Sequence, residues 1–380
     1  MNITISGYEA VCNLGSNIDE IFKNALGGNN GCFEIESETA PDYSLRLGKM
    51  NINLPEIENE NYKTRCNSTV LYVLNLLEPK IKELKEKYTP EDIAVICATT
   101  NTGVDEFTET DNKEFAALSN PAEFAKKYLG LKNIALSVST ACSSGNKAFK
   151  VANDLIRANT AKAAVVIGVD TIAKLPLYGF SSLEILASKP TNPLSKNYTG
   201  INIGEGCACF IVESKERAKG IDVLSLGENS DVYHPTTPNP EATEAKECIL
   251  EALKESHLSP QDIDYINLHG TGTFANDLME STAINEIFGE NTPSSSTKPL
   301  TGHCLGAAAS IETVLCSHLL NNFDGKLFPH IFDGEYNPDL KPIKLVKKNE
   351  IFKKCNVCLS NSFGFGGNNA IIILGKNNGQ

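Results

Sequence analysis

Four short blocks of the chain combine reactive side chains with small residues. The first is Ser139–Gly145, in which Cys142 stands between a strand-like run and a helix-like run. A cysteine in the first turn of a helix lies beside free backbone N–H groups and the positive end of the helix dipole. These favour the thiolate and can bind an oxyanion. Cys142 is therefore a candidate nucleophile, although a cysteine in this position can also serve packing alone.

Two further blocks carry histidines. His269 directly follows a short apolar strand-like run, which is where open α/β sheets place ligands, and His303 stands among glycines five residues after Lys298. Imidazoles in such places can donate or accept protons during catalysis. Either histidine can equally cap backbone groups, and the lysine can be a surface residue. Asp277 and Glu280 follow His269; two acids so spaced are usually a solvated helix face.

The fourth block, Ser360–Asn369, has three glycines around two phenylalanines. Such a loop exposes backbone amides and can move. Glycine loops often hold phosphate, but no Walker-type lysine follows, so a nucleotide site is not favoured. An ordinary tight turn between two strands is the alternative.

These blocks must be positioned by regular elements, and short apolar runs do alternate with longer helical ones. The predicted strands are Ile3–Ser6, Ile93–Cys97, Ile134–Ser137, Ala163–Gly168, Cys207–Glu213, Tyr265–Leu268, Val357–Ser360 and Ala370–Leu374. The predicted helices include Ser143–Ala158, Glu241–Ser256 and Ala307–Leu320. The alternation indicates α/β layers with buried sheets.

The chain also contains a weak internal echo. The segment before Cys142 is a strand that runs through small residues into a helix, and the segment Ser294–Lys298 leads through His303 into another helix. Two structurally equivalent halves would bring these helix starts face to face. This hypothesis would place the cysteine beside the histidine.

Composition excludes several classes of function. The net charge is −13, from 34 Lys and Arg against 47 Asp and Glu, and the longest basic runs are lysine pairs. A chain this acidic is repelled by phosphate backbones, so we expect no nucleic-acid partner. No apolar stretch reaches about 18 residues, and the start is typical of a strand and not of a signal peptide, so no membrane span is expected.

The twelve cysteines are scattered, and several lie within apolar strands, such as Cys97, Cys207 and Cys209. We interpret them as buried, reduced thiols of a cytoplasmic protein. Cys355 and Cys358 have the spacing of half a zinc site, but no second pair matches it. We therefore expect packing there and no metal.

Taken together and in this order, the four blocks resemble the β-ketoacyl-acyl carrier protein synthases of the thiolase superfamily, in their elongating Cys-His-His branch. The resemblance covers essentially the whole chain and includes the opening SGYEAVCNLG, the loop Asp231–Pro235 and the run SPQDIDYINLHGTGT. The priming branch has asparagine where this chain has His303. The resemblance implies a thiolase-like α/β fold of two duplicated halves, residues 1–215 and 216–380, in an α-β-α-β-α layering.

The resemblance also implies roles for the reactive residues. Cys142 would accept the acyl group, and His269 and His303 would support decarboxylation and stabilise the enolate. Lys298 and Glu280 would form an ion pair that orients this cluster. Four further residues would serve the substrate: Thr271, Thr273 and His234 by binding it, and Phe365 through its oxyanion-hole amide and as the gate between acyl pocket and malonyl site.

The implied activity is decarboxylative condensation of malonyl-acyl carrier protein with an enzyme-bound acyl group, giving 3-oxoacyl-acyl carrier protein and CO2. No cofactor is implied, since the substrates carry their own phosphopantetheine. The implied partners are acyl carrier protein and a second subunit, either an identical copy or a homologous ketosynthase-like chain. The alternative is a non-catalytic partner subunit that resembles chain-length factors, but such subunits lack the cysteine.

Some features depart from the family pattern. The segment from Asn192 to Gly206 lacks a common Asp/Arg-Asp pair, and Glu184 stands where a basic docking residue is frequent. These departures favour a polyene or polyketide-like pathway over fatty acid synthesis. We also expect pairing of subunits along Ile134–Ser139, and carrier docking on Lys63 and Arg65.

Overall fold

The computed structural model describes residues 1, 3–37 and 44–376. Ten strands of this part form one sheet in the order β10-β9-β11-β12-β8-β1-β7-β6-β4-β5. Five come from the first half of the chain: β1 (Ile3–Cys12), β4 (Ile93–Ala98), β5 (Ala135–Val138), β6 (Ala163–Asp170) and β7 (Gly206–Ser214). Five come from the second: β8 (Ile221–Ser230), β9 (Tyr265–Asn267), β10 (Ser294–Ser295), β11 (Val357–Gly364) and β12 (Asn368–Lys376).

The two groups of strands share one topology. Outward from the centre, the first group runs β1-β7-β6-β4-β5 and the second β8-β12-β11-β9-β10, so each strand of one group has a counterpart in the other. The groups join where β1 and β8 pair antiparallel. The duplication predicted from the sequence is therefore present. We propose that the halves divide between residues 215 and 216, in the turn that separates β7 from β8.

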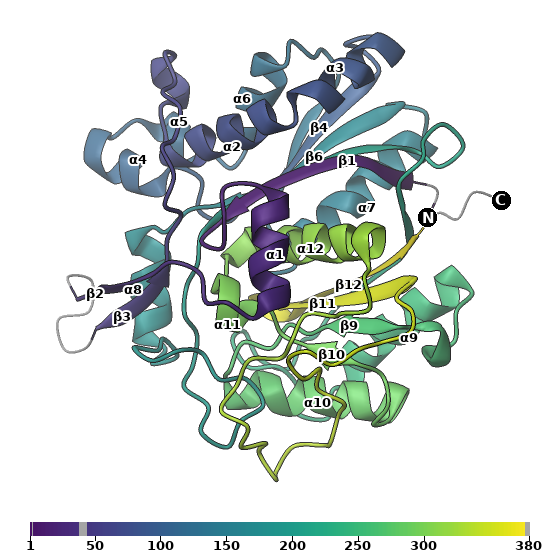
Figure 1. Cartoon of the computed structure of the whole chain (residues 1–380). Helices are drawn as coiled ribbons and strands as arrows, with labels where there is room; N and C mark the ends of the chain where they lie inside the picture. Colours follow the sequence, from purple (N-terminus) through teal and green to yellow (C-terminus); the bar gives the residue numbers. More distant parts are fainter. Residues whose placement is uncertain (2, 38–43, 377–380) are drawn as a thin grey trace.

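Helices cover and separate the two halves of the sheet (Figure 1). The outer helices of the first half are α2 (Arg65–Leu76), α3 (Glu78–Lys87) and α6 (Asn120–Tyr128), and those of the second are α9 (Thr243–Ser256) and α10 (Phe274–Phe288). Between the halves lie α7 (Ser144–Arg157) and α12 (Ala308–Asn322), each of which contacts strands of both. This confirms the predicted α-β-α-β-α layering.

The remaining elements lie outside the main sheet and the helices that cover it. They are α1 (Ile18–Gly27), β2 (Phe33–Glu36), β3 (Leu45–Gly48), α4 (Val104–Thr110), α5 (Lys113–Ala116), α8 (Lys174–Ser182), α11 (Lys298–Thr301) and the 3₁₀ turns η1 (Glu60–Tyr62), η2 (Pro260–Asp262), η3 (Leu305–Ala307) and η4 (Phe365–Gly367). Within the described residues, no helix is both long and apolar enough to cross a bilayer.

The strands that the sequence predicts best are those covered by helices on both faces. Every residue of β4 and of β6 is buried, so both read as continuous apolar runs. Strand β8 was not predicted, because Asp222 and Ser225 interrupt its apolar pattern. Both are buried and hydrogen-bonded, to Thr4 and to the carbonyl of Ala252 respectively.

Two glycines let the central helices approach closely. A side chain at Gly145, in α7, would meet the backbone nitrogen of Ser310 at 2.6 Å. At Gly168, in β6, it would meet the Ser310 hydroxyl at 2.0 Å. The start of α12 thus lies against α7 and β6, which brings the two reactive segments of the halves together.

Candidate active site

Cys142 lies on a tight turn between β5 and α7. The preceding Ala141 has a left-handed φ of 53°, unusual for a residue other than glycine, and the thiol residue is only 6% exposed. The regular helix starts at Ser144, so the cysteine stands just before the first turn that the sequence predicted for it. Gly364 packs over this turn, since a side chain there would lie 3.0 Å from the Thr140 carbonyl oxygen.

Both histidine side chains lie close to the thiol of Cys142. Cys142 Sγ lies 3.0 Å from Nε2 of His303, which precedes η3, and the ring of His269, which follows β9, lies 5.5 Å from that of His303 at 88°. One ligand-type atom of each residue lies within 4.8 Å of the others. The two halves of the fold thus bring together the three residues that the sequence singled out, across 161 positions between Cys142 and His303.

Hydrogen bonds fix the tautomer of each imidazole. Lys298 Nζ lies 3.3 Å from His269 Nδ1, and an ammonium can only donate. The backbone N–H of Leu305 donates to His303 Nδ1 at 3.2 Å. In each neutral ring Nδ1 is therefore the acceptor, so the proton resides on Nε2. Both rings consequently act as Nε2–H donors.

Burial keeps all three groups uncharged. It lowers the pKa of His269 and of His303 well below the ordinary range, and the nearby Lys298 charge lowers both further. Burial also raises the pKa of Cys142 to about 11, against the opposing effects of Lys298 and of the backbone N–H groups of Phe365 and Cys142. The resting cysteine is thus a thiol. The thiolate favoured by the position before the helix is not the resting form, because desolvation is the largest effect on the pKa of this thiol.

The expected ion pair between Lys298 and Glu280 is wrong. Lys298 instead forms a short ion pair with Glu312 of α12, and both side chains are buried. Burial raises the pKa of Glu312 to about 7, although the adjacent Lys298 opposes this. Glu312 was not predicted as a site residue; the signal for it is an acid inside the apolar run of a helix that otherwise faces the core.

Glu280 has other partners, which explains why it does not pair with the lysine. Its carboxylate accepts the backbone N–H groups of His269 and Gly270, both at 2.7 Å, and the amide of Asn361 at 2.9 Å. It therefore holds the backbone that carries the histidine. Asn361, on β11, is a second residue that the sequence analysis did not single out.

The idea that Asp277 and Glu280 form a solvated helix face is wrong, since each is 1% exposed. Asp277 accepts the backbone N–H of Leu194 at 2.7 Å. Burial raises the pKa of Asp277 to about 7. The two acids of α10 thus anchor two loops of the site from inside.

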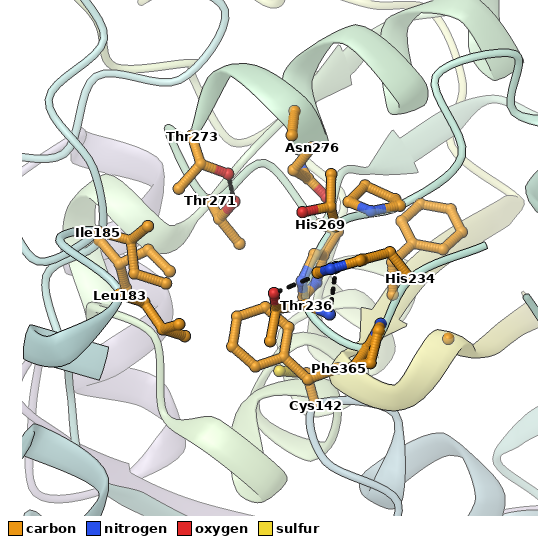
Figure 2. A pocket seen from close by; sticks show the side chains of 18 of the residues that line it. Cys142, Leu183, Ile185, His234, Thr236, His269, Thr271, Thr273, Asn276 and Phe365 are labelled. Carbon is orange, nitrogen blue, oxygen red and sulfur yellow. Dashed lines mark hydrogen bonds between the residues drawn. The ribbon is translucent and has the colours of Figure 1, made fainter. Parts of the chain in front are cut away.

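One cavity opens onto the cysteine and both histidines. Figure 2 shows Thr271 and Thr273 along one side, with hydroxyl oxygens 3.1 Å apart, and His234 on the other. His234 is exposed, and its Nδ1 accepts the backbone N–H of Thr236. All three residues expected to bind substrate therefore line this cavity.

A second cavity also borders Phe365. Phe365 and Phe180 line both cavities, and their rings stack with centroids 5.4 Å apart. Cys142 also lines both. Phe365 thus stands at the boundary that a gate would occupy. No sequence pattern marked Phe180, which is one aromatic residue in a short helix.

Cys142, His269 and His303 are also the one group in the described part of the chain whose spacing could hold a metal ion. A ligating imidazole nitrogen must carry no proton. The Nε2–H tautomers set by Lys298 and Leu305 are the wrong ones for this purpose. The cluster is therefore arranged for hydrogen bonding.

Cys355 and Cys358 are buried with sulfur atoms 3.5 Å apart. They pack together inside the core. All cysteines of the chain are free thiols.

In the segment that lacks the Asp/Arg-Asp pair, the carboxylate of Asp333 accepts bonds from Ser195 and Asn197 at 2.8 Å each. The two residues proposed for carrier docking both have acidic partners within the chain. Arg65 binds the buried Glu205 through two hydrogen bonds, and Lys63 pairs with an exposed glutamate.

Models of the beta-ketoacyl synthase N-terminal and C-terminal domains match residues 99–218 and 222–329. In a solved complex of the ketosynthase ApeO with its chain length factor ApeC from Xenorhabdus doucetiae, the similar chain is 35% identical, with a TM-score of 0.94 over 99% of this chain and 98% of that one.

Relatives named 3-oxoacyl-[acyl-carrier-protein] synthase 2 are also similar. The protein of Coxiella burnetii is 35% identical over 65% of this chain and 63% of its own length. The protein of Staphylococcus aureus strain MRSA252 is 26% identical over 99% of this chain and 98% of its own length. The chain belongs to the beta-ketoacyl synthase family.

Proposed function

We propose that this protein catalyses the decarboxylative condensation of malonyl-acyl carrier protein with an acyl group held on Cys142, releasing CO2 and 3-oxoacyl-acyl carrier protein. One observation carries the proposal. The thiol of Cys142 lies 3.0 Å from His303 Nε2 at the end of a cavity that His269 also lines. This arrangement combines a nucleophile with two neutral N–H donors.

The first step is acyl transfer. The Cys142 sulfur attacks the thioester carbonyl, the carrier thiol leaves, and the cysteine proton passes to that leaving thiolate. The N–H groups of Cys142 and Phe365, which already favour the ionised sulfur, are proposed to stabilise the oxyanion. His303 Nε2–H, at 3.0 Å, would stabilise the attacking thiolate.

The second step uses the histidines. The malonyl thioester oxygen would accept Nε2–H from His269 and His303, so that the enolate formed by loss of CO2 is stabilised in a buried site. The enolate carbon then attacks the acyl group, and the cysteine thiolate leaves and takes up a proton. Neutral donors suit this step, because burial and Lys298 keep both rings unprotonated. The substrates bring their own phosphopantetheine, and this scheme uses no further cofactor.

The partners are proposed to be acyl carrier protein and a second subunit, either another copy or a homologous chain. β5 is an edge strand of the main sheet, and Ile134 beside it is 39% exposed. A bare apolar edge invites pairing, so we propose the subunit contact there. We place the protein in the cytoplasm, where its free cysteines stay reduced.

A non-catalytic role is the second candidate. It is favoured by the similar solved complex, which contains both a ketosynthase and a chain length factor. Under that reading Cys142 would never carry an acyl group. Under either reading, we propose a polyene or polyketide-like pathway, on the sequence departures around Glu184 and Asn192.

Acyl labelling separates the two candidates. Incubation with acyl-carrier substrate should add one acyl mass to the parent and to Cys32→Ala, which removes an exposed thiol, but none to Cys142→Ala. Cys142→Ala should still release CO2 from malonyl-carrier protein. His303→Ala should keep the label but release CO2 about 10²–10³ times more slowly, as expected for loss of one oxyanion donor. An unlabelled parent that never condenses would support the non-catalytic role.

A further inference from the structure

The mouth of the cavity that both histidines line is defined by the lining residues that reach solvent. These are Leu183, His234, Pro235 and Thr237. If the proposed function holds, phosphopantetheine enters here, and the protein that carries it must rest on the surrounding surface. The chemistry of that surface therefore determines how the carrier is recognised.

Basic residues are absent from the segments that form the mouth. Residues 180–185, 231–240, 271–276 and 363–369 contain neither lysine nor arginine, but they include Glu184 and Asp231. Lys147 contacts this region, and its ammonium donates to Asn368 at 3.2 Å. With a net charge of −13, the chain offers little attraction to an acidic partner.

The mouth and the loop beside it instead present apolar side chains to solvent. Val232 is 91% exposed, Tyr233 57% and Leu183 42%. Val232 and Tyr233 belong to the loop that lines the cavity through His234 and its neighbours, and Leu183 lines the cavity itself. Clustered exposed apolar residues at a site mark contact surfaces.

The loop that presents them is held by backbone hydrogen bonds. The carboxylate of Asp231 accepts the N–H groups of Tyr233 and Asn239 at 2.7 and 2.9 Å, and the Asp231 N–H donates to the Gly367 carbonyl at 2.7 Å. Gly367 has a φ of 76°, and a side chain there would meet the Asp231 oxygen at 1.7 Å. The exposed pair is thus fixed in place before a partner arrives, which favours binding.

We propose that Leu183, Val232 and Tyr233 form an apolar docking rim for the carrier protein. The inference rests on the proposed function and specifies its partner contact. The occupant is a phosphopantetheine-bearing carrier protein that presents apolar side chains around its modified serine. Docking on this rim is the alternative to docking on Lys63 and Arg65, each of which pairs with a glutamate of the chain.

The test measures binding and turnover separately. Val232→Ser/Tyr233→Ser should weaken the affinity for a fluorescent holo-acyl carrier protein, read by anisotropy, about ten- to hundredfold, as expected for losing two apolar contacts. Leu250→Ser, which removes a 50% exposed leucine of α9, is the matched control and should bind like the parent. The parent's affinity should change less than about threefold between low and high salt, since few counterions are released.

Three results bear on the inference. Parent-like affinity in the double variant, or a steep loss of the parent's affinity with salt, would overturn the apolar rim. Equal weakening by Leu250→Ser would overturn its location. Condensation of a small thioester mimic, which needs no carrier, reports on the proposed function alone, so failure of the function and failure of the rim are distinguishable.

Discussion

Replacing Lys298 by methionine should leave the buried carboxylate of Glu312 without its partner. The same change should remove the ammonium that orients the ring of His269. Lys298 and Glu312 are only 2% and 3% exposed. Removing one partner of a buried ion pair costs about 3–5 kcal/mol of unfolding free energy. The pKa of Glu312 is about 7 even with the lysine present. Without it the carboxyl takes up a proton near neutral pH, so the cost at pH 7 should lie at the lower end of that range.

The same pKa predicts a pH slope. In the folded Lys298→Met protein Glu312 binds its proton more tightly than in the unfolded chain, whose pKa is near 4.5. The contribution of Glu312 to stability is therefore fully present below about pH 4.5 and is lost as the pH rises towards the folded pKa, above 7. This contribution should lower the unfolding free energy by about 1.4 kcal/mol per pH unit in that window. In Lys298→Met/Glu312→Leu this contribution should disappear and most of the stability return, because the unpaired carboxyl is gone.

Activity should not return with stability. Without the ammonium, nothing holds Nδ1 of His269 as an acceptor, so the Nε2–H donor is no longer fixed. Release of CO2 from malonyl-carrier protein should fall about 10²–10³-fold in both variants. Urea unfolding between pH 5 and pH 8 and a CO2-release assay measure the two effects. A double variant that decarboxylates at the parent rate would refute the role given to Lys298, and a single variant whose pH slope equals that of the double variant would refute the role given to Glu312.

Three further predictions follow from the same geometry. Alkylation of Cys142 by iodoacetamide should accelerate about tenfold per pH unit from pH 7 to pH 10, because its pKa is about 11; a plateau below pH 9 would contradict this. Gly145→Ala should destabilise the protein by about 1–3 kcal/mol in urea unfolding and slow acyl labelling, since the new methyl group would lie 2.6 Å from the Ser310 nitrogen; unchanged stability would contradict the close packing. Arg65→Ala should cost about 1–3 kcal/mol, because the buried carboxylate of Glu205 loses two hydrogen bonds, whereas a surface charge would cost almost nothing.

The sequence by itself determined the layered α/β class, most strands and the three residues that meet in the site. The reason is local: a strand covered on both faces needs an unbroken apolar run, as in β4 and β6, and the turn that presents Cys142 needs small residues. The internal echo predicted that the two halves would place Cys142 beside His303, and their atoms lie 3.0 Å apart. β8 was not predicted because Asp222 and Ser225 interrupt its apolar pattern. Both are buried nonetheless, since each has a hydrogen-bond partner elsewhere in the chain.

Only the tertiary structure decided the electrostatics of the site. Two acids compete for Lys298, and the choice of Glu312 over Glu280 follows from the backbone N–H groups that already occupy Glu280. The resting thiol of Cys142 likewise follows from desolvation by elements distant in the chain, which outweighs the local helix start. A local pattern shows which group can ionise, but the charge it carries depends on the dielectric and partners that the assembled fold places around it.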